Sequence, residues 1–291
     1  MPVDGELVRL VDVLTRTERW LRDKGIPSPR YESELLLCKA LRMERLQLYL
    51  AHDRPMTGEE LGRLRPLVRR RGQREPLAWI LEEQGFHAID LTLRPGVLVP
   101  RPDTEVLVNA LLEAIPESEP APVYVADVGC GSGAIGLALA AARPQLRVYA
   151  IDIDPVAVQL TKDNVEKLGL GDRVGVLQGD LLRAVPPQRP IDWVVSNPPY
   201  IPSADISALE PEVSRHEPRR ALDGGPDGLA AYRELIPMAA ARARRGVLVE
   251  VGHDQAGKVA DLFRRTGLVQ ISTHPDLAGI QRVVSGRVPR P

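Results

Sequence analysis

The chain has 291 residues, 44% of them hydrophobic and 26% charged, and its length favours two domains because one core rarely serves more than roughly 250–300 residues. A formal net charge of −1 argues against a protein that holds nucleic acid through its phosphates, and two cysteines exclude a disulfide framework or a cysteine-based zinc site. With no signal-peptide pattern at the start and no apolar run long enough to span a bilayer, we expect a cytoplasmic protein without a membrane segment.

The first part of the chain has the pattern of short helices. Apolar residues recur at helical spacing over residues 7–21 and again from Tyr31 onward. Thr57 and Glu60 have the form of a capping box that opens a further helix. We therefore expect residues 1–84 to form a small helical bundle.

A different pattern links this bundle to the rest of the chain. Residues 85–100 contain two β-like runs around Arg94-Pro95-Gly96, which predict a β-hairpin between two domains. After the hairpin, Asp103 or Thr104 could cap the next helix.

From Val123 onward, short apolar strands alternate with helical segments. Strands are predicted at 123–127, 146–152, 173–180, 191–196, 246–252, 268–273 and 279–286. This alternation is typical of an α/β fold, with a mostly parallel sheet and helices on both of its faces.

A glycine-rich loop, DVGCGSG (127–133), comes directly after the first of these strands. Glycine lets the backbone approach a ligand closely, and the helix that follows offers free N–H groups at its N-terminus. A dinucleotide-binding loop is the rival interpretation, but its glycines are spaced G-x-G-x-x-G. This loop reads G-x-G-x-G after an aspartate, which is the methyltransferase spacing. The expected cofactor-binding residues are Asp127, Gly129, Cys130, Gly131, Ser132 and Gly133.

Carboxylates follow the next two strands. Asp152 ends the second strand, where it could accept both hydroxyls of an adenosine ribose. Asp154 is an alternative for this role, although it could instead cap the following helix. At the end of the third strand, Asp180 could accept from the amino group of adenine, and the backbone of Leu181 could read the ring edge. A strand end exposed to solvent is the alternative at this position.

The sequence Asn197-Pro198-Pro199-Tyr200 follows the fourth strand and indicates the chemistry. An amide nitrogen is a poor nucleophile because its lone pair is delocalised. The Asn197 side-chain oxygen and the Pro198 carbonyl could accept its two hydrogens, while Tyr200 stacks on the planar group. We expect Asn197, Pro198 and Tyr200 to be catalytic, Asn197 also to lie beside the cofactor, and all four residues to bind substrate. A simple turn is the alternative.

Other polar residues give weaker signals. Glu250 and His253 close the fifth strand, and either could be catalytic, but direct methyl transfer needs no strong base and we expect structural roles for both. His87, His216 and His274 form no recognisable ligand set, so no metal is predicted.

Together these motifs resemble the class I methyltransferases that modify nitrogen, and the whole chain resembles the release-factor glutamine methyltransferase family, HemK/PrmC. The matching segments are PRPDTEVLV (100–108), DVGCGSGAIG (127–136), AIDIDPVAV (150–158), SNPPYIP (196–202) and EPRRALDGGPDGL (217–229). Adenine and cytosine amino-methyltransferases share N-P-P-Y, whereas the first and last segments are much more specific. One departure is ILEEQGF (80–86), where a glycine is expected near Glu82.

The resemblance implies a Rossmann-like sheet of seven strands in a methyltransferase domain over residues 101–291. It also implies S-adenosylmethionine as the methyl donor, with S-adenosyl-L-homocysteine as product. The substrate would be the glutamine of the GGQ motif in peptide chain release factors, whose methylation modulates translation termination, and residues 1–84 would dock that substrate. No direct nucleic-acid partner is expected.

Two other functions are weighed against this one. An adenine-amino methyltransferase acting on DNA or RNA is disfavoured by the near-neutral charge. A donor-binding translation factor without catalysis is disfavoured by the intact N-P-P-Y.

A basic run lies on the third predicted helix and just beyond it. It comprises Arg63, Arg65, Arg69, Arg70, Arg71 and Arg74. This run is either a solvated helix face or a docking surface for an acidic part of the release factor, and the sequence leaves both interpretations open.

Overall fold

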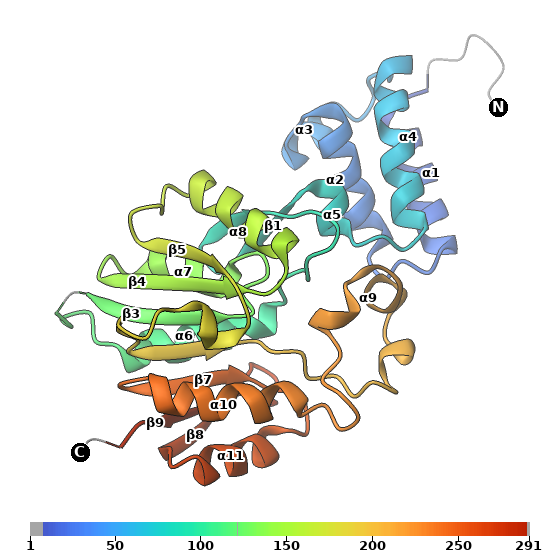
Figure 1. Ribbon diagram of the computed structural model, residues 1–291. Coiled ribbons are helices and arrows are strands. Elements are labelled where there is room, and N and C mark those ends of the chain that lie inside the picture. Colours follow the sequence, from blue (N-terminus) through green and yellow to red (C-terminus); the bar gives the residue numbers. More distant parts are fainter. Residues whose placement is uncertain (1–7, 121, 290–291) are drawn as a thin grey trace. The chain divides into compact units, whose positions relative to one another are not determined.

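Two compact units make up the computed structural model, which describes residues 8–120 and 122–289 (Figure 1). The first unit comprises Met1–Glu82 together with Pro211–His216, and the second comprises Glu83–Glu210 and Glu217–Pro291. The division after Glu82 lies close to the boundary expected after residue 84. No sequence pattern indicated that Pro211–His216 belongs to the first unit. In the described ranges, no helix is long and apolar enough to cross a membrane.

The first unit is built from helices. They are α1 (Leu10–Asp23), α2 (Pro29–Leu41), α3 (Arg45–Leu50), α4 (Gly58–Gly72), α5 (Leu77–Leu81) and α9 (Pro211–His216). The predicted capping box opens α4, where the Thr57 hydroxyl accepts from the Glu60 N–H at 3.2 Å and the Glu60 carboxylate accepts from the Thr57 N–H at 2.9 Å. The short helices α3 and α9 are additions that the apolar pattern did not predict.

Two arginines of the predicted basic run hold the helical unit together. Arg71 is 3% exposed, hydrogen-bonds to Glu32, and pairs with Glu212 at 2.8 Å. Arg74 pairs with the same Glu212 at 2.6 Å. These ion pairs anchor α9, which explains why a segment so distant in sequence belongs to this unit. Arg71 and Arg74 therefore have a structural role.

Replacing Arg71 by alanine is expected to lower the free energy of unfolding of the helical unit by about 3–5 kcal/mol, because Glu32 and Glu212 would lose a buried partner. Arg65→Ala, at an exposed position of the same helix, is the matched control and should change it by less than about 0.5 kcal/mol. Urea denaturation followed by circular dichroism measures both. Equally small losses would contradict the structural role of Arg71.

The second unit opens with a β-hairpin whose turn lies earlier than predicted. Strands β1 (Glu83–Phe86) and β2 (Ile89–Thr92) pair antiparallel around a two-residue turn that begins at His87. The prediction of a turn at residues 94–96, in a hairpin over 85–100, is therefore wrong. His87 has a φ of 52°, so the turn uses the left-handed conformation without the glycine or asparagine that would mark it in a sequence.

The chain's departure from the family pattern also coincides with a left-handed residue. Glu82 is the C-cap of α5 and has a φ of 61°. Glycine adopts this conformation most readily, which accounts for the expected glycine at this point. In this chain the Glu82 carboxylate instead pairs with Lys39 at 2.6 Å.

A seven-stranded sheet with the order β5-β4-β3-β6-β7-β9-β8 forms the centre of the second unit. Its strands are β3 (Val123–Val128), β4 (Leu146–Asp152), β5 (Val174–Gln178), β6 (Trp193–Ser196), β7 (Gly246–Glu250), β8 (Val269–Pro275) and β9 (Gln281–Arg287). Strand β9 runs antiparallel to β7 and β8, and the remaining pairs are parallel. The predicted mostly parallel sheet of seven strands is confirmed.

Helices cover both faces of this sheet. They are α6 (Glu105–Ala114), α7 (Ala134–Ala142), α8 (Pro155–Lys167), α10 (Ala230–Arg242) and α11 (Ala256–Arg265), with 3₁₀ turns η1 (Pro102–Thr104), η2 (Leu181–Ala184), η3 (Ile206–Ala208) and η4 (Arg219–Ala221). From β3 the chain adds β4 and β5 in one direction, then β6 and β7 in the other. Because such crossovers are right-handed, α7 and α8 lie on one face and α10 on the other (Figure 1). Ligands bind where the order reverses, outside the carboxyl ends of β3 and β6.

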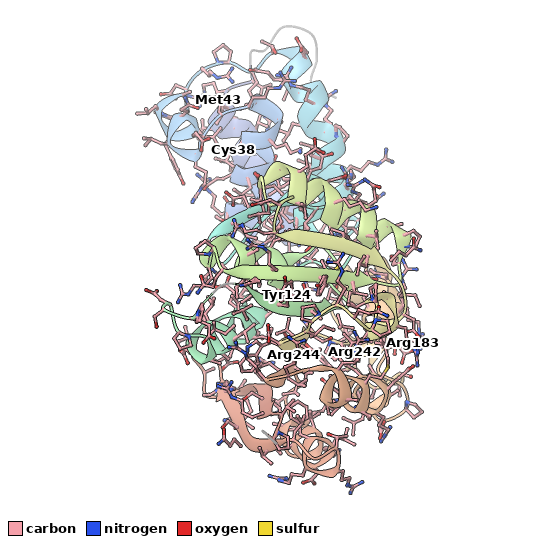
Figure 2. All side chains as sticks on the ribbon, turned by 60° about the vertical axis from the view of Figure 1, so that its left-hand side comes forward. Cys38, Met43, Tyr124, Arg183, Arg242 and Arg244 are labelled. Carbon is pink, nitrogen blue, oxygen red and sulfur yellow. The ribbon has the colours of Figure 1, made fainter. Side chains whose placement is uncertain are left out.

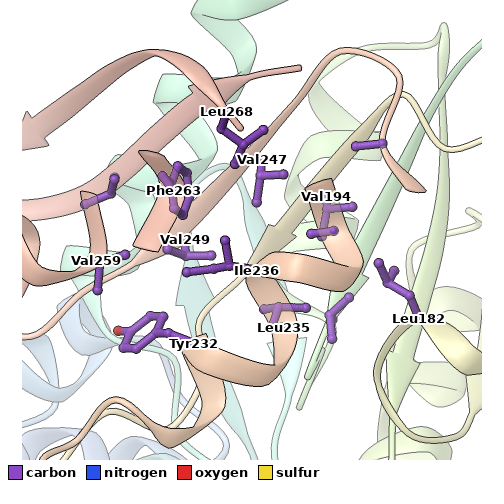
Figure 3. Close-up of a cluster of buried hydrophobic side chains, with 14 of the residues drawn as sticks. Leu182, Val194, Tyr232, Leu235, Ile236, Val247, Val249, Val259, Phe263 and Leu268 are labelled. Atoms are coloured by element: carbon purple, nitrogen blue, oxygen red, sulfur yellow. The ribbon is translucent and has the colours of Figure 1, made fainter. Parts of the chain in front are cut away.

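An aliphatic core fixes the strands that end at this crevice (Figure 3). Tyr232, Leu235 and Ile236 of α10 are each at most 1% exposed. They pack in one cluster with Val194 of β6 and Val249 of β7. Burial of these side chains holds β6 and β7 in place, and with them the polar residues at their carboxyl ends.

Candidate active site

A cavity of about 280 Å³ lies at the carboxyl ends of β3, β4, β5 and β6. All its lining residues belong to the second unit. Its volume is near the lower end of the range for small-molecule sites. The predicted residues that line it are Gly129, Cys130, Gly131, Ser132, Asp152, Asp154, Asp180, Leu181, Asn197 and Pro199. The structure thus brings together four loops that the sequence places up to 70 residues apart.

The glycine-rich loop turns because its glycines adopt left-handed backbone conformations. Gly129, Gly131 and Gly133 have φ values of 72°, 59° and 85°. The N–H groups of Gly129 and Cys130 both bond to the Ile151 carbonyl, which ties the loop to the end of β4. A Cβ on Gly129 would meet no atom within 4 Å, so the backbone at this point borders open space in which a ligand can approach closely.

Asp127 and Gly133 are not among the residues that line the cavity, and their contact with a cofactor stays a prediction. Asp127 is fully buried, and one of its carboxylate oxygens accepts from the Gly136 N–H at 2.9 Å. Burial raises the pKa of Asp127 to about 7. Its other oxygen has no hydrogen-bond partner among the described residues. Gly133 ends the loop as the N-cap of α7.

The structure separates the roles of the two aspartates after β4. Asp154 caps α8 by accepting from the Val156 N–H at 2.9 Å, and its carboxylate also pairs with Arg220. The Asp152 carboxylate accepts one backbone N–H on each oxygen, from Gly131 and from Asp154, both at 2.9 Å. Each Asp152 oxygen keeps a further lone pair for a hydroxyl. Burial raises the pKa of Asp152 above its ordinary value.

Asp180 and Leu181 form the part of the cavity wall that follows β5. Asp180 is exposed and pairs with Arg183, which is labelled in Figure 2 and also bonds to Glu234 at 3.2 Å. Leu181 has a φ of 49°, a conformation that a leucine rarely adopts. Such strain concentrates at functional sites, and here it sets the direction of the backbone at the cavity.

The N-P-P-Y segment contributes to the cavity only in part. Asn197 and Pro199 line it, whereas Pro198 and Tyr200 do not. The Asn197 amide nitrogen donates to the Thr104 hydroxyl at 3.2 Å. Tyr200 donates its hydroxyl to Glu250 at 3.2 Å. Asn197 and Tyr200 are therefore each held by a side chain from another part of the second unit, and the roles of this segment toward an acceptor stay predictions.

Thr104 has a different role from the one predicted for it. As the residue before α6, it makes no side-chain capping bond, and its hydroxyl contacts Asn197 instead. Asp103, the other candidate cap, pairs with Arg282 at 2.9 Å. The local sequence favoured capping for both residues, but their side chains instead bond to residues distant in sequence. Sequence reasoning therefore missed Thr104 as a residue of the site.

Two specific sequence segments support the N-P-P-Y turn. Arg101, in the PRPDTE segment, pairs at 2.7 Å with Glu217, which begins the EPRRALDGGPDGL segment. Gly228, near the end of that second segment, must be glycine because a Cβ there would collide with the Tyr200 carbonyl. The Gln255 amide donates to the same carbonyl at 2.8 Å. Gly228 and Gln255, distant in sequence, therefore help to fix the backbone of the N-P-P-Y turn.

His253 lies outside the cavity and pairs with Asp254 on the surface. His87, His216 and His274 contact Asn109, the Gln73 carbonyl and Ser285 respectively. Within the described ranges, no group of three or more His, Cys, Asp or Glu side chains is arranged to hold a metal ion.

A second cavity, of about 430 Å³, lies between α1 and α4 of the helical unit. Most of its lining residues are apolar, and its polar members include Arg16, Arg65 and Arg69. In the part of the chain that the structure describes, these three arginines have no ion pair or side-chain hydrogen bond. Arg65 and Arg69 belong to the basic run, and its four other members each have an acidic partner: Arg63, Arg70, Arg71 and Arg74. The basic run thus consists of four arginines with ion pairs and two without one among the described residues.

The sequence of the chain matches known proteins along nearly its whole length. Residues 12–81 match the family described as PrmC N-terminal domain, and residues 102–211 match Methyltransferase small domain. The release factor glutamine methyltransferase of Geobacter sulfurreducens is 43% identical over 285 residues, which cover 97% of this chain and 98% of that protein. That of Caulobacter vibrioides is 41% identical over 279 residues, with 95% and 96% covered.

A solved structure, that of the hMettl16 catalytic domain in complex with MAT2A 3′UTR hairpin 6, has a TM-score of 0.56 and 15% identity, and covers 70% of this chain and 77% of that one. This similarity shows the class I methyltransferase fold alone. The identity and coverage of the full-length relatives show more: the chain belongs to the release factor glutamine methyltransferase family.

Proposed function

We propose that this chain transfers a methyl group from S-adenosylmethionine to the side-chain amide nitrogen of the glutamine in the GGQ motif of peptide chain release factors. The observation that carries the proposal is that the glycine-rich loop and the N-P-P-Y turn end two neighbouring strands, β3 and β6, at one cavity. Full-length similarity to release factor glutamine methyltransferases supports the same reaction. Since release factors act on ribosomes, we infer a cytoplasmic location.

The residues at the cavity fit the methyl donor. S-adenosylmethionine supplies an electrophilic methyl group on a positively charged sulfur and leaves as S-adenosylhomocysteine. The free lone pairs of Asp152 suit the two ribose hydroxyls, and the open backbone at Gly129 suits close approach of the amino-acid part. Asp180 and the Leu181 backbone are placed after the next strand for the adenine edge.

On the other side of the cavity, the N-P-P-Y turn orients the acceptor. The Asn197 side-chain oxygen and the Pro198 carbonyl accept the two hydrogens of the glutamine amide, and the Tyr200 ring stacks on its plane. These contacts favour electron density at the nitrogen and fix the direction from which it meets the methyl carbon. The nitrogen forms its new bond to carbon as the carbon–sulfur bond breaks, and it sheds one proton after the transfer. No residue of the chain has to act as a strong base.

A labelling experiment tests this function. Wild-type enzyme is incubated with methyl-labelled donor and either purified release factor, release factor with the GGQ glutamine changed to alanine, or nucleic acid. Label on intact release factor alone is the expected result. Label on nucleic acid would support the adenine-amino methyltransferase alternative, and no label on any acceptor would support a binding protein without catalysis.

We further propose that the helical unit docks the release factor through the cavity between α1 and α4. A mostly apolar lining that includes arginines without ion pairs among the described residues is complementary to an acidic, partly apolar surface. The arginines of the basic run that form ion pairs are excluded from this docking role because acidic partners already neutralise their charges. Deleting residues 1–82 would also remove the partners of α9, so point variants test the docking role more cleanly than a truncation.

Reversing the charges of Arg65 and Arg69 to glutamate is expected to raise the KM for release factor roughly tenfold, with kcat and donor affinity little changed. The matched control reverses Arg244 and Arg265, two exposed arginines of the second unit, Arg244 being marked in Figure 2. Steady-state methylation at varied release factor concentration measures the effect. Equal KM changes in both double variants would mean that only overall charge matters and would sink the docking proposal.

A further inference from the structure

A buried carboxyl group lies behind the N-P-P-Y turn. Glu250, the last residue of β7, is 2% exposed. Its Oε1 accepts from the Tyr200 hydroxyl at 3.2 Å, its Oε2 has no hydrogen-bond partner among the described residues, and the Thr104 hydroxyl lies close enough to lower its pKa. Thr104 in turn accepts from the Asn197 amide nitrogen at 3.2 Å. The carboxyl therefore bonds to Tyr200 directly and has an unpartnered oxygen near the hydroxyl that holds Asn197.

The backbone of Glu250 is fixed independently of these contacts. Strand β7 is central in the sheet, between β6 and β9. The Glu250 carbonyl accepts from the Tyr232 hydroxyl at 2.7 Å, and Tyr232 is fully buried. The carboxyl group thus extends from a rigid strand toward a turn whose side chains would otherwise rotate.

The direction of the hydrogen bonds in this chain determines which end of the Asn197 amide faces the substrate. An ionised carboxylate can only accept, and Thr104, which accepts from Asn197, keeps its single hydroxyl hydrogen to donate to the unpartnered Glu250 oxygen. The Thr104 oxygen is then left as an acceptor, and only the NH₂ end of Asn197 can bond to it. The Asn197 oxygen, which the glutamine amide needs as an acceptor, is consequently turned away from Thr104.

We propose that Glu250 is a positioning residue, which acts through Thr104 to orient the Asn197 amide and directly on Tyr200 to hold the stacking ring. This inference rests on the proposed function, in which Asn197 and Tyr200 hold the glutamine amide. Neither Glu250 nor Thr104 contacts the reacting nitrogen in this scheme. They determine the orientation of the groups that do.

The ionisation of Glu250 makes the mechanism sensitive to pH. Burial raises the pKa of Glu250 to about 7, while the hydroxyls of Thr104 and Tyr200 oppose that rise. Asp103 also raises this pKa, and Arg282 lowers it. Below the raised pKa, the protonated carboxyl can itself donate, which frees Thr104 to donate to Asn197 and reverse its amide. Single-turnover methylation should therefore decline as the pH falls below about 7 and be highest above it.

A matched pair of Thr104 variants tests the positioning role without disturbing the buried glutamate. Valine has the shape of threonine but no hydroxyl, whereas serine keeps the hydroxyl. Thr104→Val is expected to lower the single-turnover rate roughly 10- to 100-fold at saturating substrates, and Thr104→Ser to stay within about threefold of wild type. Because Thr104 lines the donor cavity, donor affinity is measured separately by calorimetry and should be similar in both.

Glu250→Gln provides the second test, because glutamine keeps an acceptor oxygen but does not ionise. Its rate should lose the decline below about pH 7 that wild type shows. Asp127 also titrates near this pH, so a decline that persists in Glu250→Gln would assign the effect to Asp127 and contradict the inferred role of Glu250.

The outcomes separate this inference from the proposed function. A wild type that labels no release factor contradicts the proposed function itself. A wild type that labels release factor, with Thr104→Val reacting at the same rate as Thr104→Ser, contradicts only the positioning role.

Discussion

Asn197→Ala is expected to lower the rate of methyl transfer roughly 10²–10³-fold while leaving donor binding nearly intact, by analogy with the loss of one preorganised hydrogen-bond donor from an oxyanion hole. Asn197 follows β6 at the cavity, and its amide nitrogen is already held by Thr104. Alanine would leave the glutamine amide free to rotate and to keep its lone pair in the π system. The contact strengthens as the nitrogen pyramidalises, so the loss falls on the chemical step and not on substrate affinity.

Single-turnover methylation with both substrates saturating measures this effect, and Asn197→Asp is the companion variant. Aspartate keeps the shape and one acceptor oxygen, but it adds a negative charge near the cationic donor and cannot donate to Thr104. We expect a rate above that of alanine and well below wild type. A rate for Asn197→Ala within about twofold of wild type would mean that the amide clamp does not activate the nitrogen.

Regular elements could be predicted where local pattern and tertiary burial agree. Strand β4 occupies residues 146–152, as predicted, because its alternate side chains are buried against neighbouring strands and helices. The segments that follow β3, β4, β5 and β6 also came together at one cavity, since parallel strands present their carboxyl ends at one edge. The motif spacing was therefore enough to bring most of the predicted residues to one cavity.

Other features depend on contacts that no local pattern encodes. The turn at His87 uses a left-handed conformation that sequence assigns to glycine or asparagine. Helix α9 joins the helical unit because Glu212 pairs with Arg71 and Arg74, well over a hundred residues away. The sequence predicted that Thr104 caps a helix, yet its hydroxyl accepts a hydrogen bond from Asn197. In each case a tertiary contact overrode the local preference.

Asp152→Ala is expected to weaken donor binding roughly 10²–10⁴-fold, because two hydrogen bonds from ribose hydroxyls to a charged group contribute on the order of 1.5–3 kcal/mol each. The carboxylate also accepts from the Gly131 and Asp154 N–H groups, so alanine removes an anchor of the glycine-rich loop as well. Asp154→Ala is the matched control. It removes the α8 cap and should cost about 1 kcal/mol of stability, with donor affinity reduced less than about tenfold.

A ribose-modified ligand distinguishes direct contact at Asp152 from loss of the loop. Calorimetry compares S-adenosylhomocysteine with its 2′-deoxy analogue on wild type and on Asp152→Ala. If Asp152 binds the hydroxyl, wild type binds the 2′-deoxy analogue more weakly than S-adenosylhomocysteine. Asp152→Ala should bind the two compounds equally well, because the partner of the missing hydroxyl is already absent. Burial raises the pKa of Asp152. As the pH is lowered, affinity for S-adenosylhomocysteine should therefore begin to fall at a higher pH than it would with an exposed aspartate. This pH dependence should be absent in Asp152→Ala. An unchanged donor affinity of Asp152→Ala would assign the ribose contact to Asp154. If the 2′-deoxy analogue binds both proteins more weakly by the same factor, Asp152 acts only through its hydrogen bonds to the loop.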